Sequence, residues 1–156
     1  MRHVTRILEA AAPHEPATRR VTLDYDARHR RRAVLSCDDG SEVLLDLPAA
    51  VHLQHGDALL LDDGTLVAVH AAPEAVLQLA TRSEHERVRI AWHLGNRHVA
   101  TELGPGWLRI RVDHVLAELA ARLGATVTTI EAPFNPEAGA YAGHAHERPA
   151  PWAPRR

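Results

Sequence analysis

The tripeptide Asp-Asp-Gly occurs twice in the first half of this chain, as residues 38–40 and as residues 62–64. Asp-Gly between apolar runs is a strong short-range signal for a tight β-hairpin, because the turn needs residues that accept a positive φ. Each copy is flanked by two such runs. These runs are residues 32–37, 42–47, 58–61 and 65–69. The sequence therefore predicts two consecutive hairpins, which restricts the first half of the chain to a fold built on a sheet.

Residues 1–72 as a whole contain short strand patterns and no convincing helix. Val21-Thr-Leu23, for example, alternates apolar and polar residues ahead of the first hairpin. This pattern is typical of a small barrel or sandwich. We expect a β-rich domain that ends at a linker around Ala71-Ala-Pro73.

The second half mixes strand and helix patterns. Ser83 and Glu86 match a capping box, which predicts a helix start, and Asp113 can cap a second helix that stops at Gly124. The predicted elements are a strand at 75–80, a helix at 83–94, strands at 98–103 and 107–111, a helix at 113–123 and a strand at 126–130. This βαββαβ order is the ferredoxin-like arrangement. We therefore predict an α+β fold, with a ferredoxin-like domain over residues 73–142.

The stretch His93-Leu-Gly-Asn-Arg-His98 lies where the first predicted helix stops. Val88 and Leu94 are part of that helix's apolar spacing. Gly95 is free to take a positive φ and is expected to end the helix, so that His98 opens the next strand. On a continuous helix, residues five apart point roughly 140° away from each other, so the two histidines do not form a chelating pair. They are either surface residues at a helix end or ligands of different sites.

Other histidines extend this pattern. His114 follows the Asp113 cap, and His144 and His146 share one side of an extended segment. The chain has 12 histidines, and imidazole suits nickel, copper and zinc. Residues 143–156 lack periodicity and are expected to form a flexible tail. Taken alone, His114 fits a helix's first turn equally well, and the tail pair fits solvated residues.

Arg28-His-Arg-Arg-Arg32 is the one basic cluster, and alternate arginines on a strand share a face. Two interpretations stay open. The simpler is a solvated strand edge guarded by charge, and the other is a surface for an acidic partner or a phosphate backbone. Three further histidines form no ligand-like cluster and are expected at the surface. They are His52, His55 and His70.

The composition argues against an enzyme. All 18 basic residues are arginine, so a Walker lysine and a Schiff-base lysine are absent. The chain has no Gly-x-Ser-x-Gly elbow and no His-Glu-x-x-His segment. The single cysteine, Cys37, lies in an apolar run and suits a reducing compartment. We expect no catalytic residues and no cofactor-binding residues.

The net charge of -2 gives no strong field for nucleic acid or membranes. No signal peptide opens the chain, and no apolar run approaches the roughly 20 residues of a membrane span. These features predict a cytoplasmic protein that binds neither nucleic acid nor a membrane.

Three ordered segments resemble the UreE family of urease accessory proteins, which are nickel metallochaperones. The segments are residues 93–98, 113–116 leading to 123–124, and 132–141. The resemblance implies a β-rich peptide-binding first half and a ferredoxin-like second half. It also implies that His98 binds nickel at the centre of a homodimer, with peripheral binding at His93 and His114. Val112 stands where some relatives have a second histidine, which weakens the His114 site.

The same resemblance implies the function and the partners. The chain would deliver Ni²⁺ for maturation of the urease active site, through the urease-maturation GTPase UreG and the urease apoprotein complex. In this context His144 and His146 become candidate ligands. An imidazole site also accepts Zn²⁺ or Cu²⁺, so the ligand set does not select nickel. The alternative is an RNA- or peptide-binding adaptor that uses the ferredoxin-like sheet and the Arg28–Arg32 cluster.

Overall fold

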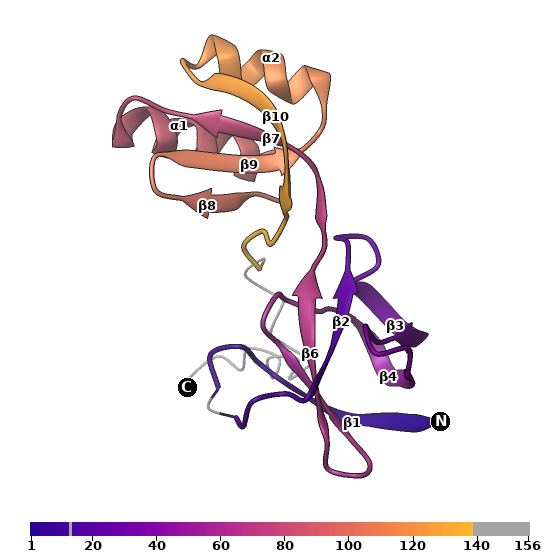
Figure 1. Ribbon diagram of the computed structural model, residues 1–156. Coiled ribbons are helices and arrows are strands. Elements are labelled where there is room, and N and C mark those ends of the chain that lie inside the picture. Colours follow the sequence, from indigo (N-terminus) through magenta and orange to yellow (C-terminus); the bar gives the residue numbers. More distant parts are fainter. Residues whose placement is uncertain (13, 139–156) are drawn as a thin grey trace, which may run out of the picture.

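The computed structural model describes residues 1–12 and 14–138, which form an N-terminal domain and a C-terminal domain (Figure 1). The N-terminal domain consists of six strands. They are β1 (Arg2–Leu8), β2 (Arg19–Leu23), β3 (His29–Ser36), β4 (Glu42–His52), β5 (Ala58–Leu61) and β6 (Leu66–Ala71). Ala72 alone separates β6 from the first strand of the C-terminal domain.

The six strands form one curled sheet in the order β2-β6-β5-β1-β4-β3. The two predicted hairpins are confirmed, because β3 pairs with β4 and β5 pairs with β6, both antiparallel. Gly40 and Gly64 each have a φ of 81°, as the predicted turns require. The β1–β4 and β2–β6 pairs are parallel. The sheet has two edges, β2 and β3, and its apolar side chains enclose a single core.

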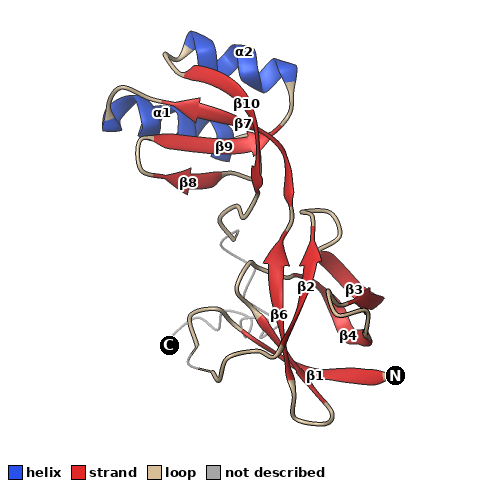
Figure 2. Ribbon diagram, in the orientation of Figure 1, coloured by secondary structure: helices blue, strands red, loops and turns tan. Residues whose placement is uncertain are grey.

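The C-terminal domain has the predicted βαββαβ order. Its elements are β7 (Pro73–Ala80), α1 (Glu84–Gly95), β8 (Glu102–Gly104), β9 (Trp107–Arg111), α2 (His114–Arg122) and β10 (Thr126–Pro133). The strands pair antiparallel in the order β10-β7-β9-β8, which is the ferredoxin-like sheet. The helices of the described residues are confined to this domain (Figure 2), and neither is long and apolar enough to cross a membrane.

Both helices pack against one face of this sheet. Ile90 and Leu94 of α1 and Ala120 of α2 share a buried cluster with strand residues such as Leu79. The helical face predicted for α1 was partly wrong, because Val88 is 58% exposed. Ile90, which the sequence analysis did not select, is buried instead.

The predicted helix starts are confirmed. The Ser83 hydroxyl accepts a hydrogen bond from the backbone N–H of Glu86 at 3.1 Å, and the Asp113 carboxylate accepts one from Leu116 at 2.9 Å. The Glu86 carboxylate accepts from the N–H of Arg82 at 3.0 Å. These caps satisfy backbone donors that a helix start leaves free.

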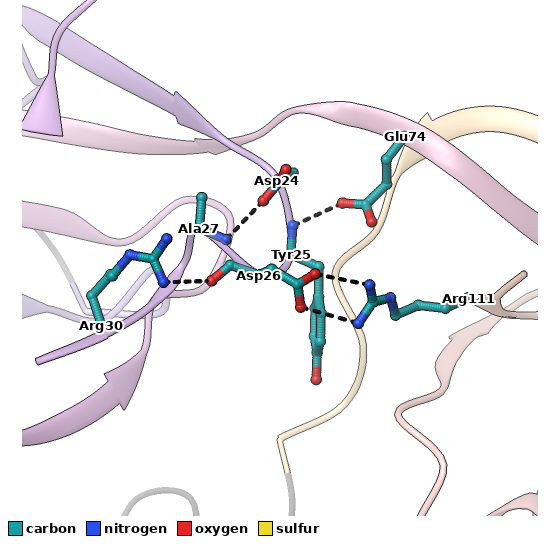
Figure 3. A network of polar contacts seen from close by, with 7 residues as sticks. All are labelled: Asp24, Tyr25, Asp26, Ala27, Arg30, Glu74 and Arg111. Carbon is teal, nitrogen blue, oxygen red and sulfur yellow. Dashed lines mark hydrogen bonds and ion pairs between the residues drawn. The ribbon is translucent and has the colours of Figure 1, made fainter.

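The two domains meet through ordered contacts. β7 enters and β10 leaves the C-terminal sheet on the side that faces the N-terminal domain (Figure 1). Phe134, which follows β10, is fully buried, and its ring lies 5.2 Å from the ring of Tyr25. Arg111 pairs with both oxygens of Asp26 at 3.0 and 2.8 Å (Figure 3). The turn between β2 and β3 therefore contacts several elements of the C-terminal domain.

Candidate metal site

His98 lies in a turn that closes the end of α1. After Gly95 the chain makes one further turn, in which the N–H of Val99 donates to the carbonyl of Leu94 at 3.1 Å. The N–H of His98 donates to the carbonyl of Gly95 at 3.0 Å. These two bonds form a Schellman motif, whose last turn needs one residue in the left-handed conformation. His98 is that residue, with a φ of 55°.

Helix α2 ends in the same way with a different residue. The N–H of Ala125 donates to Ala120 at 3.0 Å, and the N–H of Gly124 donates to Ala121 at 3.1 Å. Gly124 takes the left-handed position with a φ of 105°. Across residues 1–12 and 14–138, His98 is the one non-glycine residue with a positive φ.

The predicted end of α1 at Gly95 is confirmed, but the positive φ predicted for Gly95 was wrong. Gly95 is helical, and the turn lies three residues later. The physical reason is burial, because this position of the turn packs Val99 against the core cluster that contains the fully buried Leu94. Such a contact commonly accompanies a Schellman motif. The strand predicted at 98–103 is correspondingly shorter and begins at Glu102.

The other described candidate ligands lie near helix ends. His93 is half-buried in the last turn of α1 and contacts the Trp92 ring edge-on at 5.1 Å. His114 is the first residue of α2 and is exposed, as is His98. Val115, beside His114, is 60% exposed.

The topology brings these histidines to one end of the sheet without forming a cluster. Helix α1 follows β7 and runs back, so it ends at the end of the sheet where β7 starts. Helix α2 follows β9 and starts at the same end, because Val76 at the start of β7 pairs with Arg111 at the end of β9. Within the described part of the chain, no three His, Cys, Asp or Glu side chains lie close enough to hold a metal ion. His144 and His146 lie outside the described residues.

Residues 134–138, which lead toward the tail, pass beside the residues that follow His98. The N–H of Glu137 donates to the carbonyl of Thr101 at 2.9 Å, three residues after His98. The last described residue, Ala138, therefore follows a point that is fixed beside the His98 loop, which we define as residues 98–101.

Among the described residues, the N-terminal histidines form no metal cluster, and the surface prediction holds only in part for His52, which is half-buried. Its ring lies 4.5 Å from the Tyr25 ring, and its Nε2 is buried with no hydrogen-bond partner among the described residues. Burial, and then the charges of Arg28 and His29, lower the pKa of His52 to about 4. His55 is exposed, and its Nδ1 accepts from the N–H of Ala71 at 3.2 Å.

The basic cluster divides into a buried residue and an exposed strand. Arg30, Arg31 and Arg32 are exposed on the edge strand β3, which fits the charged-edge interpretation. Arg28 precedes the strand and is fully buried, so the prediction that it shares an exposed face with the others was wrong.

The C-terminal sheet also gives little support to an RNA-binding surface. RNA-reading sheets present free aromatic rings on which bases stack. The guanidinium of Arg109 covers the Trp107 ring at 4.0 Å, and two hydrogen bonds of 3.0 and 3.1 Å hold that guanidinium to Gln78. Phe134 is fully buried. Neither ring is free to stack on a base.

Sequence reasoning missed two features. One is the left-handed position of His98, which the apolar pair Leu94 and Val99, five residues apart, indicates in hindsight. The other is the role of Arg28 between the domains, for which no local pattern exists because its partners are distant in sequence.

Two family models together match most of the chain. The family model "UreE urease accessory protein, N-terminal domain" matches residues 4–72, and the corresponding C-terminal domain model matches residues 74–151. A urease accessory protein UreE from Rhodopseudomonas palustris (strain HaA2) is 53% identical over 133 residues, which cover 85% of this chain and 61% of that protein.

Two further relatives match over more of their own length. A protein of the same name from Bradyrhizobium sp. (strain ORS 278) is 49% identical over 94% of this chain and 70% of the relative. One from Chelativorans sp. (strain BNC1) is 44% identical over 91% of this chain and 90% of the relative. The chain therefore belongs to the UreE urease accessory protein family, and it is an accessory protein, not a catalytic enzyme.

Proposed function

We propose that this protein is a nickel metallochaperone, which binds Ni²⁺ as its cargo at His98 and delivers it for maturation of the urease active site. The observation that carries the proposal is the left-handed conformation of His98, at a position that α2 gives to glycine. A non-glycine residue there costs about 1 kcal/mol or more. Such a cost is commonly retained at functional sites, and an exposed imidazole is a good ligand for Ni²⁺.

The site belongs to a homodimer in this proposal. A two-fold axis doubles each ligand, so one His98 per chain becomes a pair. The absence of a three-ligand cluster within the described residues of one chain is compatible with a shared site. Val88 and Trp92, four residues apart on α1, are 58% and 65% exposed and offer apolar surface next to the helix end for a second copy.

Four other histidines act as auxiliary ligands. His93 and His114 lie at the same end of the sheet as His98, and the tail that carries His144 and His146 follows the contact between Glu137 and Thr101. Deletion of residues 143–156 should therefore lower nickel capacity or affinity and leave the dimer intact.

The metal and the partners come from the family context. By the usual affinity order Cu²⁺ binds an imidazole site more tightly than Ni²⁺, and Zn²⁺ comparably, so selection rests on metal availability and on partners. The GTPase UreG and the urease apoprotein complex are the proposed recipients. We place the handover in the cytoplasm, since the chain has a single, buried cysteine, Cys37, and its fold depends on no intrachain disulfide, which suits a reducing compartment.

Nickel titration of the metal-free protein, followed by calorimetry and by size measurement, tests the site. His98→Ala should weaken the tightest site by more than about a hundredfold, beyond the effect of losing an outer-shell partner. The matched control is His85→Ala, which removes an exposed histidine from the opposite end of the same helix. Tight binding by His98→Ala, at one nickel per dimer, would refute the assignment.

Delivery needs a separate assay, namely activation of apo-urease at limiting nickel with purified accessory proteins. Wild type and His85→Ala should raise activation equally, and His98→Ala should not raise it above the level without added protein. Equal activation by wild type and His98→Ala would remove the delivery role.

A further inference from the structure

Arg28 is buried at the boundary between the two domains. Its Nη1 donates to the carbonyl of Leu53 at 3.2 Å and to Oδ1 of Asn135 at 3.1 Å, and its Nη2 donates to the carbonyl of Phe134. Its side chain is fully buried, and its Nε has no hydrogen-bond partner among the described residues. A buried and incompletely paired charge is a poor source of stability, because its desolvation is costly. The main effect of Arg28 is thus to fix the position of the two domains relative to each other, and its contribution to stability is small.

Asn135 connects this arginine to the C-terminal domain. Its Oδ1 also accepts from the N–H of His55 at 2.8 Å, so two groups of the N-terminal domain share one side-chain oxygen. On the other side, the N–H of Asn135 donates to the carboxylate of Glu102 at 3.1 Å. Two residues later Glu137 donates to Thr101. The segment 134–137 is therefore bonded to the N-terminal domain on one side and to the residues after His98 on the other.

A second set of contacts holds the same turn of the N-terminal domain. Figure 3 shows Arg111 paired with Asp26, and Glu74 accepting from the N–H of Tyr25 at 2.8 Å. The turn that carries Arg28 is thus fixed to both β7 and β9. These contacts restrict the movement of Arg28 relative to the C-terminal sheet. Its hydrogen bonds therefore hold segment 134–137 in one position.

The backbone of the His98 loop is held mainly at its two ends, while Val99 and Ala100 pack against neighbouring core clusters. Residues 98–101 make no strand pairing, since β8 starts at Glu102. The Schellman turn of α1 fixes the loop at one end, and the bonds of Asn135 and Glu137 fix it at the other. Removal of the second constraint leaves the loop held by the helix end and by the packing of Val99 and Ala100.

We propose that Arg28 and Asn135 form an interdomain clamp that positions the His98 loop, so that the N-terminal domain sets the geometry of the metal site. Both are positioning residues, which act through segment 134–137 and do not touch the metal. The effect on nickel rests on the proposed function of His98, whereas the effect on the loop does not.

The test compares Asn135→Ala with Asn135→Asp in the full-length protein. Aspartate keeps an oxygen that accepts from Arg28 and His55, and alanine does not. In the metal-free protein, Asn135→Ala should speed hydrogen exchange of the Glu137 amide about tenfold, the size expected for the loss of one or two buried hydrogen bonds. Nickel affinity should fall about fivefold to tenfold. Asn135→Asp should stay close to wild type in both measurements.

Arg28→Met should match Asn135→Ala, and the matched control is Arg32→Met, which removes an exposed arginine of the same cluster. If Arg28→Met does not fold, the Asn135 pair decides. Unchanged Glu137 exchange in Asn135→Ala overturns the clamp. Changed exchange with unchanged nickel affinity overturns control of the site by the clamp. Tight nickel binding by His98→Ala would instead refute the proposed function, and the exchange data would still decide the clamp.

Discussion

The two helices of the C-terminal domain end in the same hydrogen-bonded turn, but the left-handed residue is His98 in one and Gly124 in the other. Glycine is required at the second end for two reasons. Its φ is 105°, and a Cβ there would lie 3.1 Å from a carboxylate oxygen of Glu86. At the first end the side chain is exposed and meets no such barrier. Turn geometry explains the glycine at position 124, whereas at position 98 it accepts histidine better than most non-glycine residues, which leaves the exposed imidazole available for the proposed function.

The two ends also differ in what surrounds them. Gly124 precedes β10, whose first residue pairs with Ala80 at the end of β7 that is remote from the N-terminal domain. The His98 end lies at the opposite side, where Thr101 is bonded to Glu137. The candidate ligand is thus on the end of the sheet that the N-terminal domain reaches, and Gly124 is on the opposite end.

A loss of stability is expected from a substitution at the Gly124 end. Gly124→Ala should lower the free energy of unfolding by about 1–2 kcal/mol, because alanine is strained at this φ and its Cβ approaches Glu86. Denaturant unfolding measures this change. Nickel binding at His98 should not change, and a variant as stable as wild type would show that the two ends do not share the same turn requirement.

Acidification should lower the stability of the protein through His52, which lies near the boundary between the domains. The pKa of His52 is about 4 in the folded protein, below its ordinary 6.5, because burial and the charges of Arg28 and His29 disfavour the imidazolium. Between these pH values the unfolded chain binds a proton that the folded chain does not, so stability falls as the pH falls from 6.5 to 4.

His52→Phe is the matched variant for this prediction, since it keeps a ring beside Tyr25 and cannot titrate. The difference between the two curves of unfolding free energy against pH isolates the imidazole. A difference that stays constant from pH 6.5 to pH 4 would contradict the burial of a neutral His52. Hydrogen exchange at Gly124 should be the same in both proteins.

The sequence predicted the features that depend on neighbours in the chain. Both Asp-Gly turns and the caps at Ser83 and Asp113 are local hydrogen-bonding or φ requirements, and each formed as expected. The burial of Arg28 depends on Phe134, which is 106 residues away. No local pattern carries such a contact, so the arginine was grouped with its exposed neighbours.

The candidate site was predicted through resemblance and not through local rules. The local rule for glycine placed the end of α1 correctly at Gly95, but it also placed the left-handed residue there, because it did not weigh the burial gained when Val99 packs near Leu94. That tertiary contact moved the left-handed residue to His98. A rule based on neighbours in the chain thus missed the left-handed residue, because a tertiary contact decides its position.

The smallest change concerns the tolerance of the left-handed position itself. His98→Asn should alter the free energy of unfolding by less than about 0.5 kcal/mol, because asparagine and histidine both accept this conformation better than most residues. His98→Ala should lose more, since alanine lacks this tolerance. Equal stability of the two variants in denaturant unfolding would contradict the left-handed φ of His98.

The most direct test replaces His98 by glycine, the residue that α2 has at the equivalent left-handed position. His98→Gly should raise the free energy of unfolding by about 0.5–1 kcal/mol, since the left-handed cost disappears, and the same sample should lose the tight nickel site in calorimetric titration. Gained stability together with lost nickel binding would establish that the imidazole is retained for metal at the expense of the turn. A His98→Gly variant that still binds nickel tightly, or that is less stable than wild type, would contradict the account.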